Sequence, residues 1–176
     1  DVGADCVVLA SRGHSAWRDF FLGSTVMDAA RIARLPLVII PVDGAMHPDG
    51  PVLLATDGSA NSSAAEDAFL ELVQRGRQGL ALHAGPRADG ASARAVEAEQ
   101  AEQRLEALAK AGVATHHVDA EPRDAIPRMA RDEGASLIVV GKRGHNPLTE
   151  LLLGSTAEAV CRQSGVPVLL VPGEGA

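Results

Sequence analysis

The chain contains one loop sequence twice, and the distance between the two copies is constant. The stretch VLASRGHSAWRDFFLGST runs from Val8 to Thr25, and VVGKRGHNPLTELLLGST runs from Val139 to Thr156. Both contain Arg-Gly-His, eight further residues and Gly-Ser-Thr, 131 positions apart, and two prolines after each copy keep the same offset. Chance rarely keeps so many glycines and prolines in register, so the chain is first of all an internal repeat.

The two copies of the loop have unequal surroundings. The match begins with Asp1 opposite Asp132, so the first copy has almost no chain before its loop, whereas the second copy has a long stretch. We therefore expect residues 1–43 to be the last part of a first domain, 44–50 to be a turn-rich linker and 51–173 to be a complete domain. On this interpretation the chain is a fragment of a two-domain protein, cut within its first domain.

Composition excludes several kinds of partner. An apolar fraction of 46% is typical of a packed core. The net charge of −7 argues against nucleic-acid binding, which needs a basic face, and an aromatic fraction of 2% leaves no stacking platform for single strands. No apolar run approaches the roughly 18 residues of a membrane span. We therefore expect neither nucleic acid nor membrane among the partners, and we expect a cytoplasmic protein.

The sequence predicts no metal site. Cys6 and Cys161 show no spacing typical of metal ligands and stand among apolar residues, so both are predicted to be small core residues. His116 and His117 are neighbours in a predicted strand, where successive side chains point to opposite faces. They are therefore not expected to bind one metal ion together.

Apolar runs and helical patterns alternate five times after residue 50. Strands are predicted over residues 51–58, 79–85, 113–118, 135–141 and 166–172. Ser59 or Asn61 can cap the first helix between them. The third helix is predicted to start near Arg123, which places Pro127 in the first turn, where proline is tolerated. The expected fold class is α/β: a doubly wound, five-stranded parallel sheet, Rossmann-like, preceded by a partial β-α-β copy of the same domain.

Two loops at the carboxyl ends of predicted strands carry the candidate chemistry, because ligands of open α/β sheets bind at these ends. One is ATDGS, which contains Thr56 and Asp57. The other is a glycine pattern in which two residues separate Gly141 from Gly144 and nine separate Gly144 from Gly154. Its spacing differs from both the Walker A loop and the dinucleotide fingerprint.

The chemistry of the glycine pattern suits a phosphate group. Glycines let backbone N–H groups approach an anion closely. Gly154, Ser155 and Thr156 open a predicted helix, where free N–H groups and the positive end of the dipole favour negative charge. Arg143 adds a charge that can bind phosphate through two hydrogen bonds. The alternative is structural, with a glycine in a turn and Ser155 as a helix cap.

With these motifs the chain resembles the universal stress protein family. The resemblance covers residues 50–172 and rests on the aspartate after the first strand and on the intact signature Gly141, Gly144, Gly154 and Ser155. It implies a fold like that of the adenine nucleotide alpha hydrolases. Because tandem members of the family exist, the repeat indicates a tandem-domain member truncated within its first domain.

The resemblance also implies roles for individual residues. Asp57 would contact the nucleoside, with Thr56 beside it, and Ala84 would lie against adenine. The residues implied to bind the phosphates of ATP, with Mg²⁺ as a further candidate, are Gly141, Arg143, Gly144, Gly154, Ser155 and Thr156. Two positions depart from the pattern: Ala84 is smaller than the valine often found there, and Ala10 replaces the first glycine in the first copy.

Three functions follow from these observations. The first is an ATP-binding module that acts in stress response or regulation through nucleotide-dependent interactions. The second is a slow ATP hydrolase, for which only Asp57 with a divalent metal could orient water, so we assign no catalytic residue. His14 and His145 follow loop glycines, but the sequence places no nucleophile or carboxylate beside them. The third is a nucleotide-free association module built on sheet edges.

The last strand of each copy is apolar and is expected at a sheet edge that needs a partner. In the resembling family, edge-to-edge pairing of last strands is a usual way to form dimers. We therefore predict that Leu37–Ile40 runs antiparallel beside Val168–Val171. The first copy should lack a complete nucleotide site, because its counterpart of Asp57 would lie before Asp1.

Overall fold

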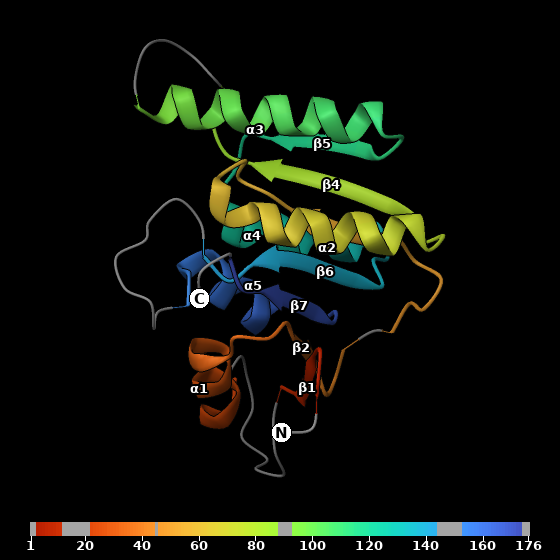
Figure 1. Ribbon diagram of the computed structural model, residues 1–176, viewed down its shortest axis with the longest axis vertical. Coiled ribbons are helices and arrows are strands. Elements are labelled where there is room, and N and C mark those ends of the chain that lie inside the picture. Colours follow the sequence, from red (N-terminus) through yellow and green to blue (C-terminus); the bar gives the residue numbers. More distant parts are fainter. Residues whose placement is uncertain (1–2, 12–21, 45, 88–92, 144–152, 174–176) are drawn as a thin grey trace.

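The computed structural model describes residues 3–11, 22–44, 46–87, 93–143 and 153–173. In these residues the strands are β1 (Val7–Ala10), β2 (Leu37–Ile40), β3 (Val52–Ala55), β4 (Gly79–Ala84), β5 (Ala114–Val118), β6 (Leu137–Gly141) and β7 (Val168–Val171). The helices are α1 (Ser24–Ile32), α2 (Ser63–Gln74), α3 (Ala93–Lys110), α4 (Pro122–Asp132) and α5 (Ser155–Gln163), and a 3₁₀ turn, η1 (Ala60–Ser62), precedes α2. Strands and helices alternate along the chain except that β3 follows β2 directly (Figure 1).

All the described strands form one seven-stranded sheet in the order β1-β2-β7-β6-β3-β4-β5. Neighbouring strands are parallel except at one place, where β2 and β7 are antiparallel. The interior strand β3, between β6 and β4, has the sequence VLLA, and all of its residues are buried. A continuous apolar run is expected in a parallel strand that helices cover on both sides. The structure therefore has an α/β fold with a mostly parallel sheet.

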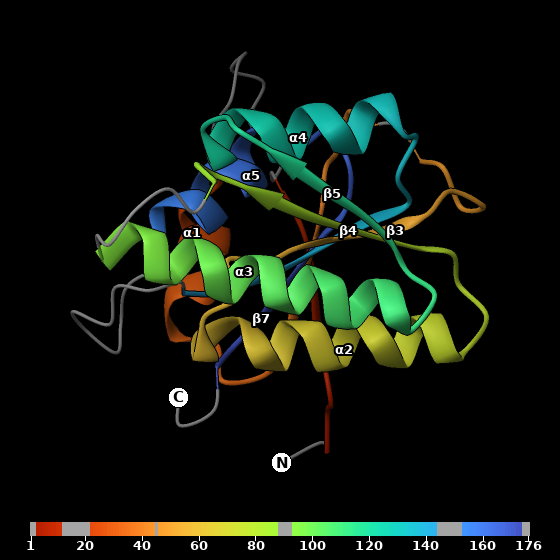
Figure 2. The same cartoon turned by 90° about the horizontal axis from the view of Figure 1, so that it is seen from above.

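Helices lie on both faces of the sheet (Figure 2). α2 and α3 contribute to one core, in which Phe69 is fully buried and Leu105 packs nearby. α1, α4 and α5 contribute to the other core, which includes Met27 and Val160. The apolar stripe of α2 runs through Ala65 and Phe69, and it faces the sheet as its helical spacing predicts.

The predicted pairing of β2 with β7 is confirmed. Leu37 lies opposite Leu170 and Ile39 lies opposite Val168 in an antiparallel ladder. Leu37 and Ile39 are each only 1% exposed, so the pairing buries the apolar side chains that would otherwise stand at an edge. Both strands are therefore in the interior of the seven-stranded sheet, whose outer strands are β1 and β5.

The units on either side of this pair have matching hydrogen bonds. β1, α1 and β2 form one parallel unit, and β6, α5 and β7 form another. Equivalent contacts are offset by 131 residues: Val7–Leu37 and Ile138–Val168 across the strands, and Gly23–Ser11 and Gly154–Lys142 before the helices. The described parts of the repeated sequence thus fold into the same local geometry twice.

A buried lysine connects the two units. Lys142 follows β6, and its Nζ donates hydrogen bonds to the carbonyl oxygens of Arg31 and Ala33 at the end of α1. The last carbonyls of a helix have no partner within the helix, and they favour a positive charge. Burial lowers the pKa of Lys142, and the neighbouring Arg143 charge lowers it further. Lys142 therefore acts as a cap that α1 receives from the other half of the sheet.

One expectation about α4 and one about α2 need correction. α4 begins at Pro122, near Arg123 as predicted, but Pro127 lies inside the helix beyond the first turn and not within it. Pro122 suits a helix start because a proline there lacks only an N–H that has no intrahelical acceptor. Neither Ser59 nor Asn61 is the N-cap of α2: the N-cap is Ser62, and no side-chain cap bond forms.

The prediction for the cysteines is half right. Cys161 is buried, and this burial raises the pKa of its thiol to about 12. Cys6, which was expected in the core, is exposed. It immediately precedes β1, an outer strand of the sheet, where no strand of the described residues covers it. An apolar context along the chain therefore did not imply burial in space.

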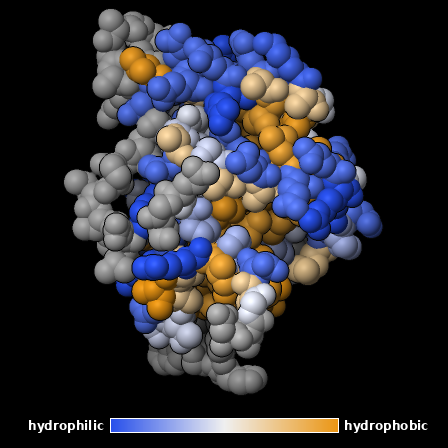
Figure 3. Space-filling view, in the orientation of Figure 1, coloured by the Kyte–Doolittle hydropathy of each residue, from blue (hydrophilic) through white to orange (hydrophobic). Residues whose placement is uncertain are grey.

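Apolar surface shows between hydrophilic bands in the lower part of Figure 3, over the region that contains β1, β2 and α1 in Figure 1. Val8 on β1 is 59% exposed and Ile32 at the end of α1 is 67% exposed.

Among the described residues, none of the helices is long and apolar enough to cross a membrane.

Gly58 provides a test of how α3 packs against the loop after β3. A Cβ atom on Gly58 would lie 2.6 Å from the backbone N of Ala101, and the residue has φ +72°. Gly58→Ala should lower the free energy of unfolding by about 1–2 kcal/mol for the left-handed backbone and by about 1–3 kcal/mol more for the overlap. Urea unfolding would measure this loss.

The control is Gly112→Ala, since Gly112 also has a positive φ, +85°, but no atom lies within 4 Å of the position that a Cβ atom would take there. Gly112→Ala should lower the free energy of unfolding only by the cost of the left-handed backbone, about 1–2 kcal/mol. Equal losses in the two variants would contradict the close packing of α3 on Gly58.

Candidate functional site

Three strand ends meet at one edge of the sheet. β3 lies between β6 and β4, with Ala55 opposite Val140 on one side and Leu82 on the other. Because these strands are parallel, the residues that follow them emerge side by side. Thr56 and Asp57 therefore lie between the ends of β4 and β6.

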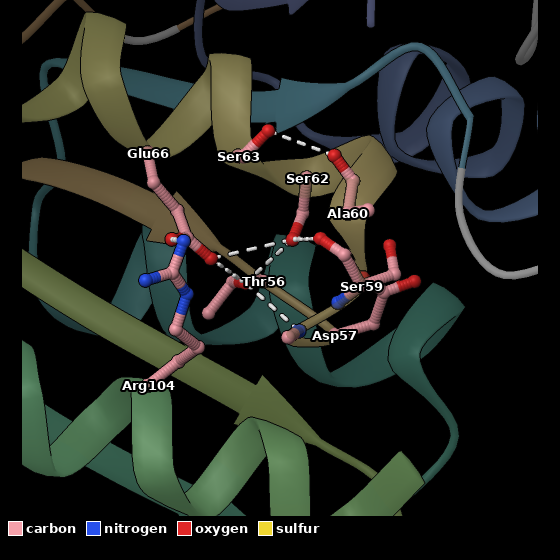
Figure 4. A network of polar contacts seen from close by, with 9 residues as sticks. Thr56, Asp57, Ser59, Ala60, Ser62, Ser63, Glu66 and Arg104 are labelled. Atoms are coloured by element: carbon pink, nitrogen blue, oxygen red, sulfur yellow. Dashed lines mark hydrogen bonds and ion pairs between the residues drawn. The ribbon is translucent and has the colours of Figure 1, made fainter.

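The loop after β3 is held by its own hydrogen bonds. The carboxylate of Asp57 accepts a bond from the backbone N of Ser59 at 3.0 Å, and Thr56 Oγ1 accepts one from the backbone N of Gly58 at 3.1 Å. Side chains that accept from an N–H two residues later stabilise a tight turn. Asp57 is half-buried, whereas Thr56 is buried, with its hydroxyl directed to the carboxylate of Glu66 (Figure 4).

Ser59 carries an unsatisfied polar atom in this loop. Its Oγ is buried and has no hydrogen-bond partner among the described residues. Buried hydroxyl groups are nearly always paired with protein, water or ligand. The hydroxyl lies two residues from Asp57, so the loop holds a donor whose partner is not among the described residues.

Ala84 ends β4 and is buried, which leaves a small apolar position beside the loop of Asp57. The preceding residue, His83, is buried, and its Nδ1 donates to the carbonyl oxygen of Thr56 at 3.0 Å. On the neighbouring strand β5, His117 donates from Nε2 to the carbonyl oxygen of Gly85 at 2.9 Å. The two rings pack edge to face with centroids 5.1 Å apart, and they tie together the ends of three strands.

Gly141 has a structural role in the glycine pattern. A Cβ atom here would lie 3.0 Å from the carbonyl oxygen of Arg143 and 3.3 Å from that of Asn61. The missing side chain therefore lets the end of β6 approach η1. The structure thus gives Gly141 a packing role between two backbone segments, and its expected approach to an anion stays a prediction.

The start of α5 presents amide groups at the same edge. Gly154 is the N-cap residue, and no side chain caps the helix, so Ser155 is the first helical residue and not the cap. The N of Gly154 donates to the carbonyl oxygen of Lys142 at 2.9 Å. The amides of Ser155 and Thr156 belong to the first turn, whose N–H groups lack intrahelical acceptors. Ser155 is exposed and Thr156 is half-buried, so their hydroxyl groups are accessible beside these amides.

Charges near the start of α5 are partly compensated. Arg143, two residues after β6 ends, is half-buried. Glu158, in the first turn of α5, pairs with Arg162 at 2.9 Å, which reduces its repulsion of an anion.

Gly144, His145, His14 and Trp17 lie outside the described residues. No group of three or more potential metal ligands is found among the residues that the structure describes.

A buried acidic residue belongs to the site and was not predicted from the sequence. Glu66 is only 4% exposed, and its carboxylate accepts from Thr56 Oγ1 at 2.7 Å and pairs with Arg104 of α3 at 3.0 Å (Figure 4). A signal for it was present, because Glu66 lies on the apolar stripe of α2, three residues before Phe69. A charged residue on a buried stripe requires a partner.

Fold and site together define an open α/β protein whose strand ends present a carboxylate, a small apolar position and the start of a helix. The family model for universal stress proteins matches residues 50–172. The chain belongs to the universal stress protein family.

Relatives match beyond these residues. Universal stress protein Rv2005c of Mycobacterium tuberculosis is 34% identical over 181 residues, which cover 95% of this chain and 61% of that protein. Universal stress protein Rv2623 of the same organism is 30% identical and is covered to 63%. The chain thus spans about three fifths of the length of these relatives.

Solved structures share the fold. A universal stress protein from Archaeoglobus fulgidus superposes with a TM-score of 0.72 at 23% identity, covering 97% of this chain and 63% of that one. A universal stress protein in complex with cAMP has a TM-score of 0.52 at 25% identity and covers 71% of this chain and 98% of that one.

The buried His83 predicts a pH dependence of stability. Burial lowers the pKa of His83 below its usual 6.5, and this effect exceeds the opposing hydrogen bond to Thr56. The unfolded chain therefore binds the proton more readily, so stability is full above the unfolded pKa and is lost as pH falls through the folded pKa. His83→Asn, which keeps a donor but does not titrate, should lose less stability between about pH 7.5 and about pH 5.

Urea unfolding at several pH values would measure the difference, with His116→Asn as the control because His116 is exposed on β5. This variant should follow the pH profile of the unsubstituted chain. The same profile in His83→Asn would show that His83 is not the titrating group.

Proposed function

We propose that this chain is an adenine nucleotide-binding module, with ATP as its ligand, that acts in stress response or regulation through nucleotide-dependent interactions. The observation that carries this proposal is the uncapped start of α5 at Gly154, Ser155 and Thr156, placed at the same sheet edge as Asp57. Such a helix start favours an anion. The relative solved in complex with cAMP supports a ligand that contains adenine.

The residues at this edge fit the parts of a nucleotide. Asp57 accepts hydrogen bonds from the nucleoside, Thr56 supports the loop that carries it, and Ala84 lies against adenine. The phosphate groups are assigned to the residues of the glycine pattern, which are Gly141, Arg143, Gly144, Gly154, Ser155 and Thr156. The unpaired hydroxyl of Ser59 is a further donor. Mg²⁺ would bind the phosphates and neutralise part of their charge.

A wider proposal concerns the whole protein. We infer a tandem-domain cytoplasmic protein, with the last part of a first domain at residues 1–43, a linker at 44–50 and a complete domain at 51–173. The relatives' greater length and the matching geometry of the two β-α-β units support it. The β2–β7 ladder is then an internal version of a self-association contact.

Mass spectrometry of the small molecules released from the purified protein tests the function. Co-purified ATP supports the binding module. ADP, together with measurable turnover of added ATP, would favour a slow ATP hydrolase instead. A protein that carries no nucleotide and binds none in calorimetric titration would favour an association module built on the β2–β7 contact.

Gly154→Val tests the assignment of the phosphate site. Gly154 has φ −60° and ψ 142°, which a valine can adopt, so the variant should fold. Its side chain would stand at the helix start where the phosphate is expected, so ATP binding should be lost. Calorimetric titration measures the affinity and circular dichroism checks the fold. Unchanged affinity in a folded variant would refute the assignment.

Asp57→Ala tests the nucleoside contact. A lost hydrogen bond to a charged acceptor costs about 1.5–3 kcal/mol, so affinity should fall by roughly tenfold or more. The loss should be equal for adenosine and ATP, because the contact does not involve phosphate. A loss for ATP alone would instead mean that Asp57 acts through a metal ion.

A further inference from the structure

The carboxylate of Glu66 links two helices to the loop after β3. Glu66 extends from α2, and its Oε1 lies 2.7 Å from Thr56 Oγ1 and 3.3 Å from Ser62 Oγ. Its Oε2 lies 3.0 Å from a guanidinium nitrogen of Arg104 on α3. Figure 4 shows the Glu66 carboxylate between the hydroxyl groups on one side and Arg104 on the other.

The directions of the hydrogen bonds show how the Glu66 carboxylate fixes the loop after β3. A carboxylate accepts only, so Thr56 Oγ1 uses its single proton on Glu66. The lone pairs of Thr56 Oγ1 then face the loop, where the backbone N of Gly58 donates at 3.1 Å. Ser62 Oγ lies 2.8 Å from the carbonyl oxygen of Ser59 and fixes the other end of the same loop. Asp57 stands between these two fixed points.

Arg104 neutralises the buried carboxylate of Glu66. A buried carboxylate is costly unless it is paired and hydrogen-bonded. Arg104 supplies the charge from α3, the helix that also packs on the loop, where Ala101 closely approaches Gly58. The Arg104 side chain is 48% exposed, so it reaches the buried Glu66 carboxylate from the surface.

We propose that Glu66, neutralised by Arg104, is a positioning residue that fixes the Thr56–Ser59 loop so that Asp57 presents its carboxylate to the nucleoside. This inference rests on the proposed nucleotide-binding function. An apolar side chain at this position of α2 would serve packing equally well, but it would leave the Thr56 hydroxyl without its acceptor. The network thus holds a polar group in the core for the geometry of the loop.

A double-mutant cycle separates positioning from stability. The variants are Glu66→Met, Asp57→Ala and the two combined, titrated with adenosine and with ATP under conditions in which circular dichroism shows each to be folded. Glu66→Met removes the acceptor of the Thr56 hydroxyl, which a glutamine would keep, so it should weaken both ligands by the same factor, about tenfold. In the Asp57→Ala background the same substitution should change affinity by less than about twofold, because the residue that it positions is absent.

Glu71→Met is the matched control. Glu71 lies on the same helix and also pairs with an arginine, Arg75, but both side chains are exposed. It should bind both ligands as the unsubstituted chain does. If Glu66→Met does not fold, Arg104→Met carries the same test, since it leaves Glu66 without its charge partner and should also weaken binding only when Asp57 is present.

Each result decides the question. Unchanged affinity in folded Glu66→Met would overturn the proposal and leave Glu66 with a role in stability alone. An equal loss with and without Asp57 would overturn it too, because Glu66 would then act independently. If the unsubstituted chain binds neither adenosine nor ATP, the proposed function itself fails, and the positioning role fails with it.

Discussion

The antiparallel ladder between β2 and β7 is the contact on which the arrangement of the whole sheet depends. It joins two parallel β-α-β units into one seven-stranded sheet and buries Leu37 and Ile39 almost completely. Without it, each unit would present an apolar strand with unpaired backbone groups. The ladder also brings the end of α1 to Lys142, so a residue beside the glycine pattern caps a helix of the other unit.

Much of this architecture could be predicted because it depends on local patterns. Apolar runs bounded by turns predicted β3, β6 and β7. The last strand of each repeat is apolar and needs a pairing partner at the sheet edge, and this requirement predicted the β2–β7 ladder. The exposed Cys6 was not predicted, since its exposure depends on which strands flank β1. Likewise, Pro127 lies deeper in α4 than expected because Pro122 begins that helix.

The site was only partly predictable, because some of its contacts join residues that are distant in the sequence. A glycine pattern and an aspartate after a strand are visible in the sequence, because each is carried by adjacent residues. The contact between Glu66 and Arg104 joins α2 to α3, and Thr56 enters it from a strand end. Such a network becomes visible only when the packing of helices on the sheet is known. The polar residue on the stripe of α2 indicated that a partner existed, but not which one.

Gly141 shows that one residue of a sequence signature can serve both the packing of the fold and the binding of a ligand. Its lack of a side chain allows β6 to approach η1, whatever binds nearby. A family member could therefore retain this glycine for folding after losing its ligand, and the intact motif would overstate its binding capacity. Gly154, by contrast, has backbone angles that suit any residue, so its backbone conformation does not require a glycine. Of the two glycines, Gly154 is the better indicator of ligand binding when sequences of the family are compared.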